Sequence, residues 1–111
     1  MQKSTAVSAL AALIALMALL VMHGNANAAD AQVKIANFTF EPAMLTVKVG
    51  TTVIWVNDDD IPHLVSEKDG KFRSSALDTG DKFSQTFSAA GTVEYFCAVH
   101  PHMTGKIVVE P

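Results

Sequence analysis

Three potential metal ligands of different chemistry stand close together near the end of this 111-residue chain. They are Cys97, His100 and Met103, and Cys97 is the only cysteine. A thiolate, two imidazoles and a thioether form the ligand set of a blue-copper electron-transfer centre, with two His and one Cys in a trigonal arrangement and a distant axial Met. The second imidazole must come from elsewhere, and His63 can supply it. The sequence therefore predicts a copper site made of these four residues.

Two histidines follow Cys97, but the site needs only one of them. With His100 the pattern is Cys-x2-His-x2-Met, which separates the three ligands by turns of the chain. With His102, the adjacent Met103 could hardly reach around the ion to the axial position. We therefore expect His100 to bind copper and His102 to lie exposed at the rim.

Each of these residues has a plainer explanation when it is taken alone. A lone cysteine is usually a small buried hydrophobe, and a methionine near a strand end usually packs in the core. His63 alone could be a surface residue of a turn. Their combination at this spacing, in a chain with a single cysteine, favours the copper site.

The first 28 residues differ in character from the rest. Lys3 precedes an apolar run over residues 6–22, and Ala26-Asn27-Ala28 fits the small-residue rule for cleavage, so we interpret residues 1–28 as a secretory signal peptide. An uncleaved anchor is the alternative, because the run approaches the length of a membrane span. Cleavage would leave residues 29–111 as one exported, periplasmic domain without stable membrane insertion.

Charge and cysteine content narrow the possibilities for that domain. The whole chain carries a formal net charge of −3, and loss of Lys3 with the signal peptide would make it −4. This mild acidity argues against nucleic acid as a partner. One cysteine cannot form an internal disulfide, so stability must come from the core, with possible help from a bound metal.

Short segments of alternating apolar and polar residues, separated by turn residues, run through the domain. An irregular stretch, 67–81, is expected to cross from one sheet to another. Seven or eight short strands at this spacing indicate an all-β, antiparallel β-sandwich, whose loops cluster at its ends and can bring His63 to Cys97. The segments predicted as strands are 33–40, 45–49, 52–56, 63–66, 82–87, 92–97 and 106–110.

Three adjacent carboxylates, Asp58, Asp59 and Asp60, precede the His63 segment. Their spacing fits no calcium-binding loop. We interpret them as a solvated turn, after which Pro62 restricts the chain as it enters His63.

The chain resembles the cupredoxins, the plastocyanin and azurin superfamily, and within them the amicyanin-like group. The resemblance covers the whole predicted mature chain, and its short Cys-x2-His-x2-Met loop has the amicyanin spacing. It implies a Greek-key sandwich of about eight strands and one type 1 copper ion bound by His63, Cys97 and His100, with Met103 axial. It also implies a periplasmic one-electron carrier rather than an enzyme. The matching segments are 45–50, 52–57, 62–63, 90–92 and 105–109.

Four positions depart from the family pattern. Leu64 and Ala98 stand where the superfamily often has a polar pair that braces the cysteine loop, although the Leu64 N–H could still donate to the Cys97 sulfur. Val99 replaces a typical proline and could offer a second N–H. His102 replaces an aromatic residue, and its protonation near pH 6 would put a charge into the rim.

The expected docking surface is the exposed edge of His100, ringed by Ile61, Pro62, Pro101 and His102. A small apolar rim suits brief, weak encounters between redox proteins. The partners implied are a periplasmic dehydrogenase and a c-type cytochrome, and the protein is expected to be a monomer. The alternative function is copper storage, delivery or sensing without electron transfer, which would use the same ligands.

Overall fold

The computed structural model describes residues 29–111, and all regular structure in this range is β-strand. The predicted signal peptide, residues 1–28, lies outside the described residues. In the described range no helix is long and apolar enough to cross a membrane. The strands are β1 (Asp30–Ala36), β2 (Thr39–Glu41), β3 (Met44–Lys48), β4 (Thr52–Asn57), β5 (Ser66–Glu67), β6 (Lys82–Thr86), β7 (Gly91–Cys97) and β8 (His100–Glu110).

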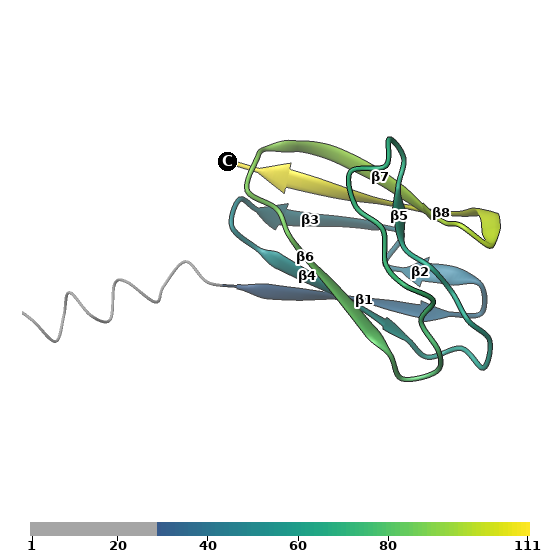
Figure 1. Ribbon diagram of the computed structural model, residues 1–111. Coiled ribbons are helices and arrows are strands. Elements are labelled where there is room, and N and C mark those ends of the chain that lie inside the picture. The colour runs from purple at the N-terminus through teal and green to yellow at the C-terminus, as the bar shows by residue number, and fades with distance from the viewer. Residues whose placement is uncertain (1–28) are drawn as a thin grey trace, which may run out of the picture.

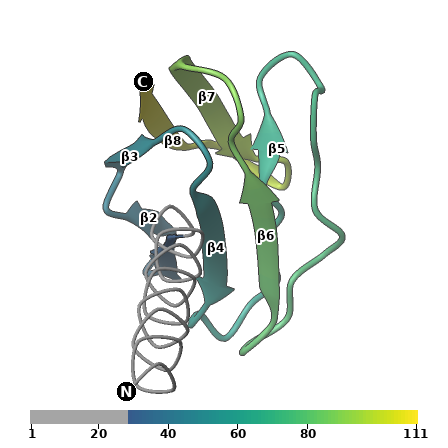
Figure 2. The same ribbon diagram turned by 90° about the vertical axis from the view of Figure 1, so that its left-hand side faces the viewer.

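These strands form two four-stranded sheets that pack on each other (Figures 1 and 2). One sheet has the order β2-β1-β4-β6 and the other the order β3-β8-β7-β5. The prediction of an all-β sandwich of about eight strands is therefore confirmed. The irregular segment between β5 and β6 passes from one sheet to the other, as its composition predicted.

Both sheets are mixed, whereas the sequence pattern predicted antiparallel sheets. β1 pairs in parallel with β4, and β3 pairs in parallel with β8. After β2 the chain crosses to the second sheet, where it forms β3. It then returns to the first sheet as β4, which lies beside β1 and runs in the same direction. Alternation of apolar and polar residues reports which face a side chain takes and not the direction of the strand.

One predicted strand, 33–40, is in fact two strands joined by a tight turn. Asn37 and Phe38 separate β1 from β2 and have φ angles of 52° and 58°. Two consecutive left-handed residues are typical of the type I′ turn of a hairpin. Asparagine tolerates this conformation, but a bulky side chain is a genuine outlier there. Because Phe38 continues the alternating pattern of a strand, the sequence did not predict this turn.

The last predicted strand, 106–110, is longer than expected and begins at His100. Cys97 pairs with His100, whereas Phe96 already pairs with Thr104, so residues 101–103 form a bulge in β8. A bulge re-aims the side chains around it. The first two residues of this bulge are exposed, and the third, Met103, points into the protein with 5% of its surface exposed.

The core between the sheets is centred on Trp55 of β4, which is completely buried. Its ring contacts those of Phe72, Phe83, Phe87 and Tyr95, with centroids 5.3 to 6.5 Å apart. Tyr95 lies on β7 of the opposite sheet, so this aromatic cluster joins the two layers. Because side chains alternate along a strand, residue 97 shares the inward face of Tyr95. The core therefore fixes the strand that ends at the cysteine.

Candidate metal centre

Three of the predicted ligands converge where β7 turns into β8. This turn lies at the right-hand end of the sandwich in Figure 1. One ligand atom from each of His63, Cys97 and His100 lies within 4.8 Å of the others. The Cys97 Sγ is 3.6 Å from Nδ1 of His63 and 3.7 Å from Nδ1 of His100. His102 is exposed and lies outside this group.

The hairpin between β7 and β8 places Cys97 opposite His100. These two residues are paired across the hairpin, and only Ala98 and Val99 stand between them. The cysteine is completely buried, whereas the imidazole of His100 is partly exposed. One side of the site therefore faces the core and the other faces solvent.

His63 comes from a different part of the chain and is held by its own backbone. The predicted strand at 63–66 is reduced to β5, and His63 makes a single antiparallel bridge to Leu77. Its N–H donates to the Leu77 carbonyl at 3.1 Å, and its carbonyl accepts from the Leu77 N–H at 2.8 Å. The side chain is completely buried. This histidine therefore has little freedom to leave the site.

Asp59 orients the His63 ring, which corrects the interpretation of residues 58–60 as a solvated turn. Its Oδ2 lies 2.8 Å from His63 Nε2, and its two carboxylate oxygens also accept the N–H groups of Asn37 at 2.7 Å and Phe38 at 3.0 Å. Asp58 and Asp60 are exposed, as expected. No spacing rule joins Asp59 to a turn about 20 residues earlier, so the sequence could not reveal this role.

The carboxyl group of Asp59 is ionised in this setting. The hydrogen bond from the Phe38 N–H is the largest influence that holds its pKa below the ordinary value, with further lowering by Asn37 and His63 and an opposing effect of burial. An ionised Asp59 can only accept a hydrogen bond from His63, so the proton of the neutral imidazole is on Nε2. The lone pair is then on Nδ1, the nitrogen that faces the Cys97 sulfur and is free to bind a metal.

The Leu64 N–H donates to the Cys97 Sγ with 3.4 Å between nitrogen and sulfur, as predicted from the sequence. An N–H donated to this sulfur favours its thiolate form. Val99 lies at the tip of the hairpin with 53% of its surface exposed. Leu64 is therefore a backbone donor that the structure places at the sulfur.

The donor atoms fit a copper ion. In zinc sites the metal lies about 2.0–2.1 Å from a nitrogen ligand and about 2.3 Å from a sulfur ligand. With similar bond lengths and a ligand–metal–ligand angle near 110–120°, the sulfur and nitrogen atoms would be about 3.6–3.8 Å apart. The two sulfur-to-nitrogen separations, 3.6 and 3.7 Å, fall in this range. Met103 is buried in the same core cluster as Cys97 and adds a thioether. This set matches blue copper rather than structural zinc.

A nucleophilic cysteine is the other chemistry that a thiol beside two imidazoles suggests. Such a cysteine must be reached by its substrate, and reactive cysteines are accordingly at least partly exposed. Cys97 has no exposed surface. The arrangement therefore fits metal binding better than covalent catalysis.

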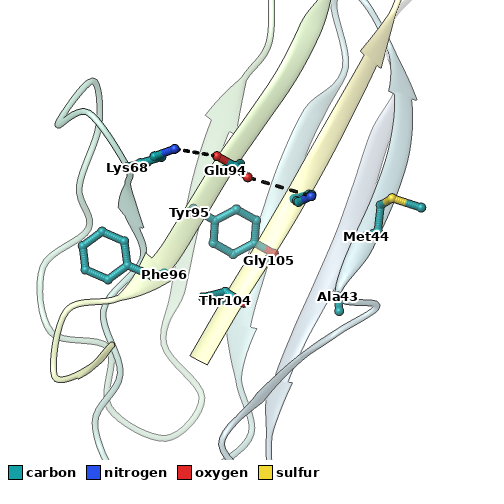
Figure 3. A pocket seen from close by; sticks show the side chains of 9 residues that line it. Ala43, Met44, Lys68, Glu94, Tyr95, Phe96, Thr104 and Gly105 are labelled. Atoms are coloured by element: carbon teal, nitrogen blue, oxygen red, sulfur yellow. Dashed lines mark hydrogen bonds and ion pairs between the residues drawn. The ribbon is translucent and has the colours of Figure 1, made fainter. Parts of the chain in front are cut away.

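A surface pocket lies away from these ligands (Figure 3). It covers the outer face of β3, β7 and β8, where Glu94 pairs with Lys68 at 3.0 Å and Lys106 at 3.8 Å. Neither His63, Cys97 nor His100 lines it. The candidate metal centre is therefore separate from this pocket.

Comparison with known proteins identifies the family. A family model described as a cupredoxin-like domain matches residues 9–109. This chain belongs to the cupredoxin-like domain family. The amicyanin-like resemblance inferred from the sequence is confirmed by the relatives described next.

Individual cupredoxins support this assignment. Amicyanin-alpha of Methylorubrum extorquens is 37% identical over 90 residues, which cover 77% of this chain and 76% of that protein. Amicyanin of Paracoccus denitrificans is 42% identical over 83 residues, which cover 70% of this chain and 63% of that protein. A Cu(I) structure of an amicyanin mutant superposes with a TM-score of 0.70 at 37% identity and covers 73% of this chain and 82% of that one.

Replacing Asp59 with asparagine is expected to weaken copper binding by about 10- to 100-fold, the usual effect of losing the group behind a histidine ligand. The neutral amide cannot accept the Nε2 proton as an ionised carboxylate does, so His63 loses its fixed orientation. Asp58→Asn is the matched control, because Asp58 is the exposed neighbour of Asp59. Competition titrations with a copper chelator would measure both variants, and equal affinities would contradict this role of Asp59.

Proposed function

We propose that this protein is a one-electron carrier and that His63, Cys97 and His100, with Met103 axial, hold a single type 1 copper ion that cycles between Cu(II) and Cu(I). The observation that carries the proposal is the convergence of one buried sulfur and two imidazole Nδ1 atoms at 3.6 and 3.7 Å. The Cu(I) form of a related amicyanin supports the choice of metal. Soft sulfur ligands suit Cu(I), and imidazole suits both oxidation states.

The protein contributes a rigid set of ligands to this reaction. When bound, copper supplies the site that gains and loses one electron. His63 is held by Asp59 and by two backbone hydrogen bonds to Leu77, and Cys97 ends a strand whose inward face is core. Little therefore has to rearrange when the charge of the site changes. The Leu64 N–H beside the sulfur stabilises its negative charge throughout.

Electrons would enter and leave through His100, which is the partly exposed ligand. We propose that an apolar surface surrounds it, made of Ile61, Pro62 and Pro101 together with Val99 and Phe38. The Phe38 ring contacts that of His100, and Phe38 and Val99 are 52% and 53% exposed. A small apolar surface suits short-lived contact with another redox protein. We propose a periplasmic dehydrogenase and a c-type cytochrome as donor and acceptor, and a monomeric, exported carrier.

The visible spectrum of the mature protein tests the proposal. Addition of Cu(II) is expected to produce an intense thiolate-to-copper band that disappears on reduction and returns on reoxidation. His100→Ala should lose this band, whereas His102→Ala should retain it. A protein without the band, or loss of the band only in His102→Ala, would contradict the proposed site.

Copper storage or delivery is the alternative function, and it uses the same ligands. His63 is buried and held by two backbone hydrogen bonds to Leu77. Because release of copper requires ligands to move, this arrangement favours a permanently bound ion over copper delivery. Reversible electron exchange with a c-type cytochrome at unchanged copper content would support the carrier. Transfer of copper to an acceptor protein during the same incubation would support delivery.

A further inference from the structure

Phe38 packs against both histidines of the candidate metal centre. Its ring meets that of His100 edge-on with centroids 5.1 Å apart, and that of His63 edge-on at 5.7 Å. The β1–β2 turn that carries it lies at the same end of the sandwich as the β7–β8 turn (Figure 1). Edge-to-face contacts between rings at these distances are attractive. One side chain from outside the ligand loops therefore contacts both imidazoles.

The conformation of Phe38 is unfavourable for its own backbone. Its φ angle of 58° is left-handed, a region in which a bulky side chain is an outlier. The type I′ turn that it shares with Asn37 strongly favours glycine at this second position. The ring is also 52% exposed, so burial in the core does not explain the choice of residue. Strained residues of this kind cluster at functional sites.

Asp59 holds this turn in place. Its carboxylate accepts the N–H groups of both turn residues and contacts His63 with the same Oδ2 that accepts from Phe38. The turn and the buried histidine are therefore tied to one group. This arrangement offsets the backbone strain and sets the ring of Phe38 at a defined position over the imidazoles.

We propose that Phe38 is a positioning residue that braces the two imidazoles and keeps His100 in its ligating orientation. His63 is completely buried and anchored by its backbone, whereas His100 is partly exposed at the start of β8, so His100 is the ligand that can swing outward. The Phe38 ring stands against that ring. This inference rests on the proposed copper site, and it predicts slow loss of the metal from the reduced protein.

Phe38→Gly separates this role from ordinary packing, because the two make opposite predictions. Glycine relieves the left-handed strain, so the unfolding temperature of the metal-free protein should stay equal to that of wild type or rise. Removal of the ring should nevertheless speed copper loss from the reduced protein to a Cu(I) chelator about tenfold. Phe38→Tyr keeps an aromatic ring at this position and should lose copper at the wild-type rate. Asn37→Gly, in the same turn, should leave the rate unchanged.

The outcomes distinguish failure of this inference from failure of the copper site. NMR contacts between the Phe38 ring and both imidazoles in the metal-free protein test the brace without copper, and His100 should become mobile in Phe38→Gly. A folded Phe38→Gly with wild-type copper loss and an ordered His100 would overturn the inference. So would an unfolding temperature below that of Asn37→Gly, because the ring would then serve packing. A wild-type protein that shows the NMR contacts but no visible copper band would instead overturn the proposed function.

Discussion

Replacing Cys97 with serine is expected to abolish the intense visible absorption of the copper protein. The absorption arises from charge transfer between a thiolate and Cu(II), and a serine oxygen cannot provide it. Loss of the soft ligand should also lower the affinity for Cu(I) by more than about 100-fold, because even groups behind the ligands are commonly worth 10- to 100-fold. Absorption spectra and competition with a Cu(I) chelator measure the two effects.

The control for this substitution is His102→Ser in the same loop. His102 is exposed and stands outside the ligand cluster, so its variant should keep both the band and the affinity. The Cys97→Ser protein should remain folded without metal, because serine is nearly isosteric and sits at the strand end. A band that survives in Cys97→Ser would show that the sulfur does not bind the copper.

Replacing Gly105 with alanine is expected to destabilise the fold by about 1–3 kcal/mol or more, the cost of overpacking a core. Gly105 pairs with Tyr95 across β7 and β8, and a Cβ on Gly105 would overlap the Tyr95 ring. Figure 3 shows the Tyr95 ring next to Gly105. The ring is wedged between Phe40 and Trp55, with centroids 4.7 and 5.3 Å away, so it has little room to move aside. Urea unfolding of the metal-free protein would measure the loss.

Thr104→Ala is the matched control, because Thr104 precedes Gly105 on β8 and is exposed. It should change the free energy of unfolding by less than about 0.5 kcal/mol, as surface substitutions usually do. A double-mutant cycle with Tyr95→Leu should show that Gly105→Ala costs much less once the ring is gone. If Gly105→Ala proves as harmless as Thr104→Ala, the close approach of the ring is wrong.

Burial of Tyr95 supports this view of the strand pair. Desolvation in the core raises the pKa of its phenol to about 12, against a smaller lowering effect of the neighbouring Trp55 side chain. Three buried side-chain atoms of residues 29–111 lack a hydrogen-bond partner: the Tyr95 hydroxyl oxygen, the Trp55 Nε1 and the Ser66 Oγ. The tyrosine is therefore held by shape and aromatic contact, which makes it sensitive to an added methyl group at Gly105.

Local spacing in the sequence was enough to predict one part of the metal centre. Cys97, His100 and Met103 are separated by two residues each, and a hairpin can bring such neighbours together without information from the rest of the chain. The short alternating segments likewise predicted an all-β sandwich, because alternation follows from which face of a strand is buried. The direction of the strands does not alter this pattern, so the mixed pairing of β1 with β4 and of β3 with β8 stayed hidden.

The groups that surround the ligands depend on tertiary contacts. The sequence alone indicates that Asp59 is one of three solvated carboxylates and that Phe38 is an ordinary residue of a strand. Their roles depend on a contact between segments 21 and 22 residues apart, from the N–H groups of the β1–β2 turn to the Asp59 carboxylate. Such a contact depends on tertiary packing, and the periodic pattern of apolar and polar residues does not predict it. Local spacing therefore specified the candidate ligands, and the fold supplied the groups that hold them.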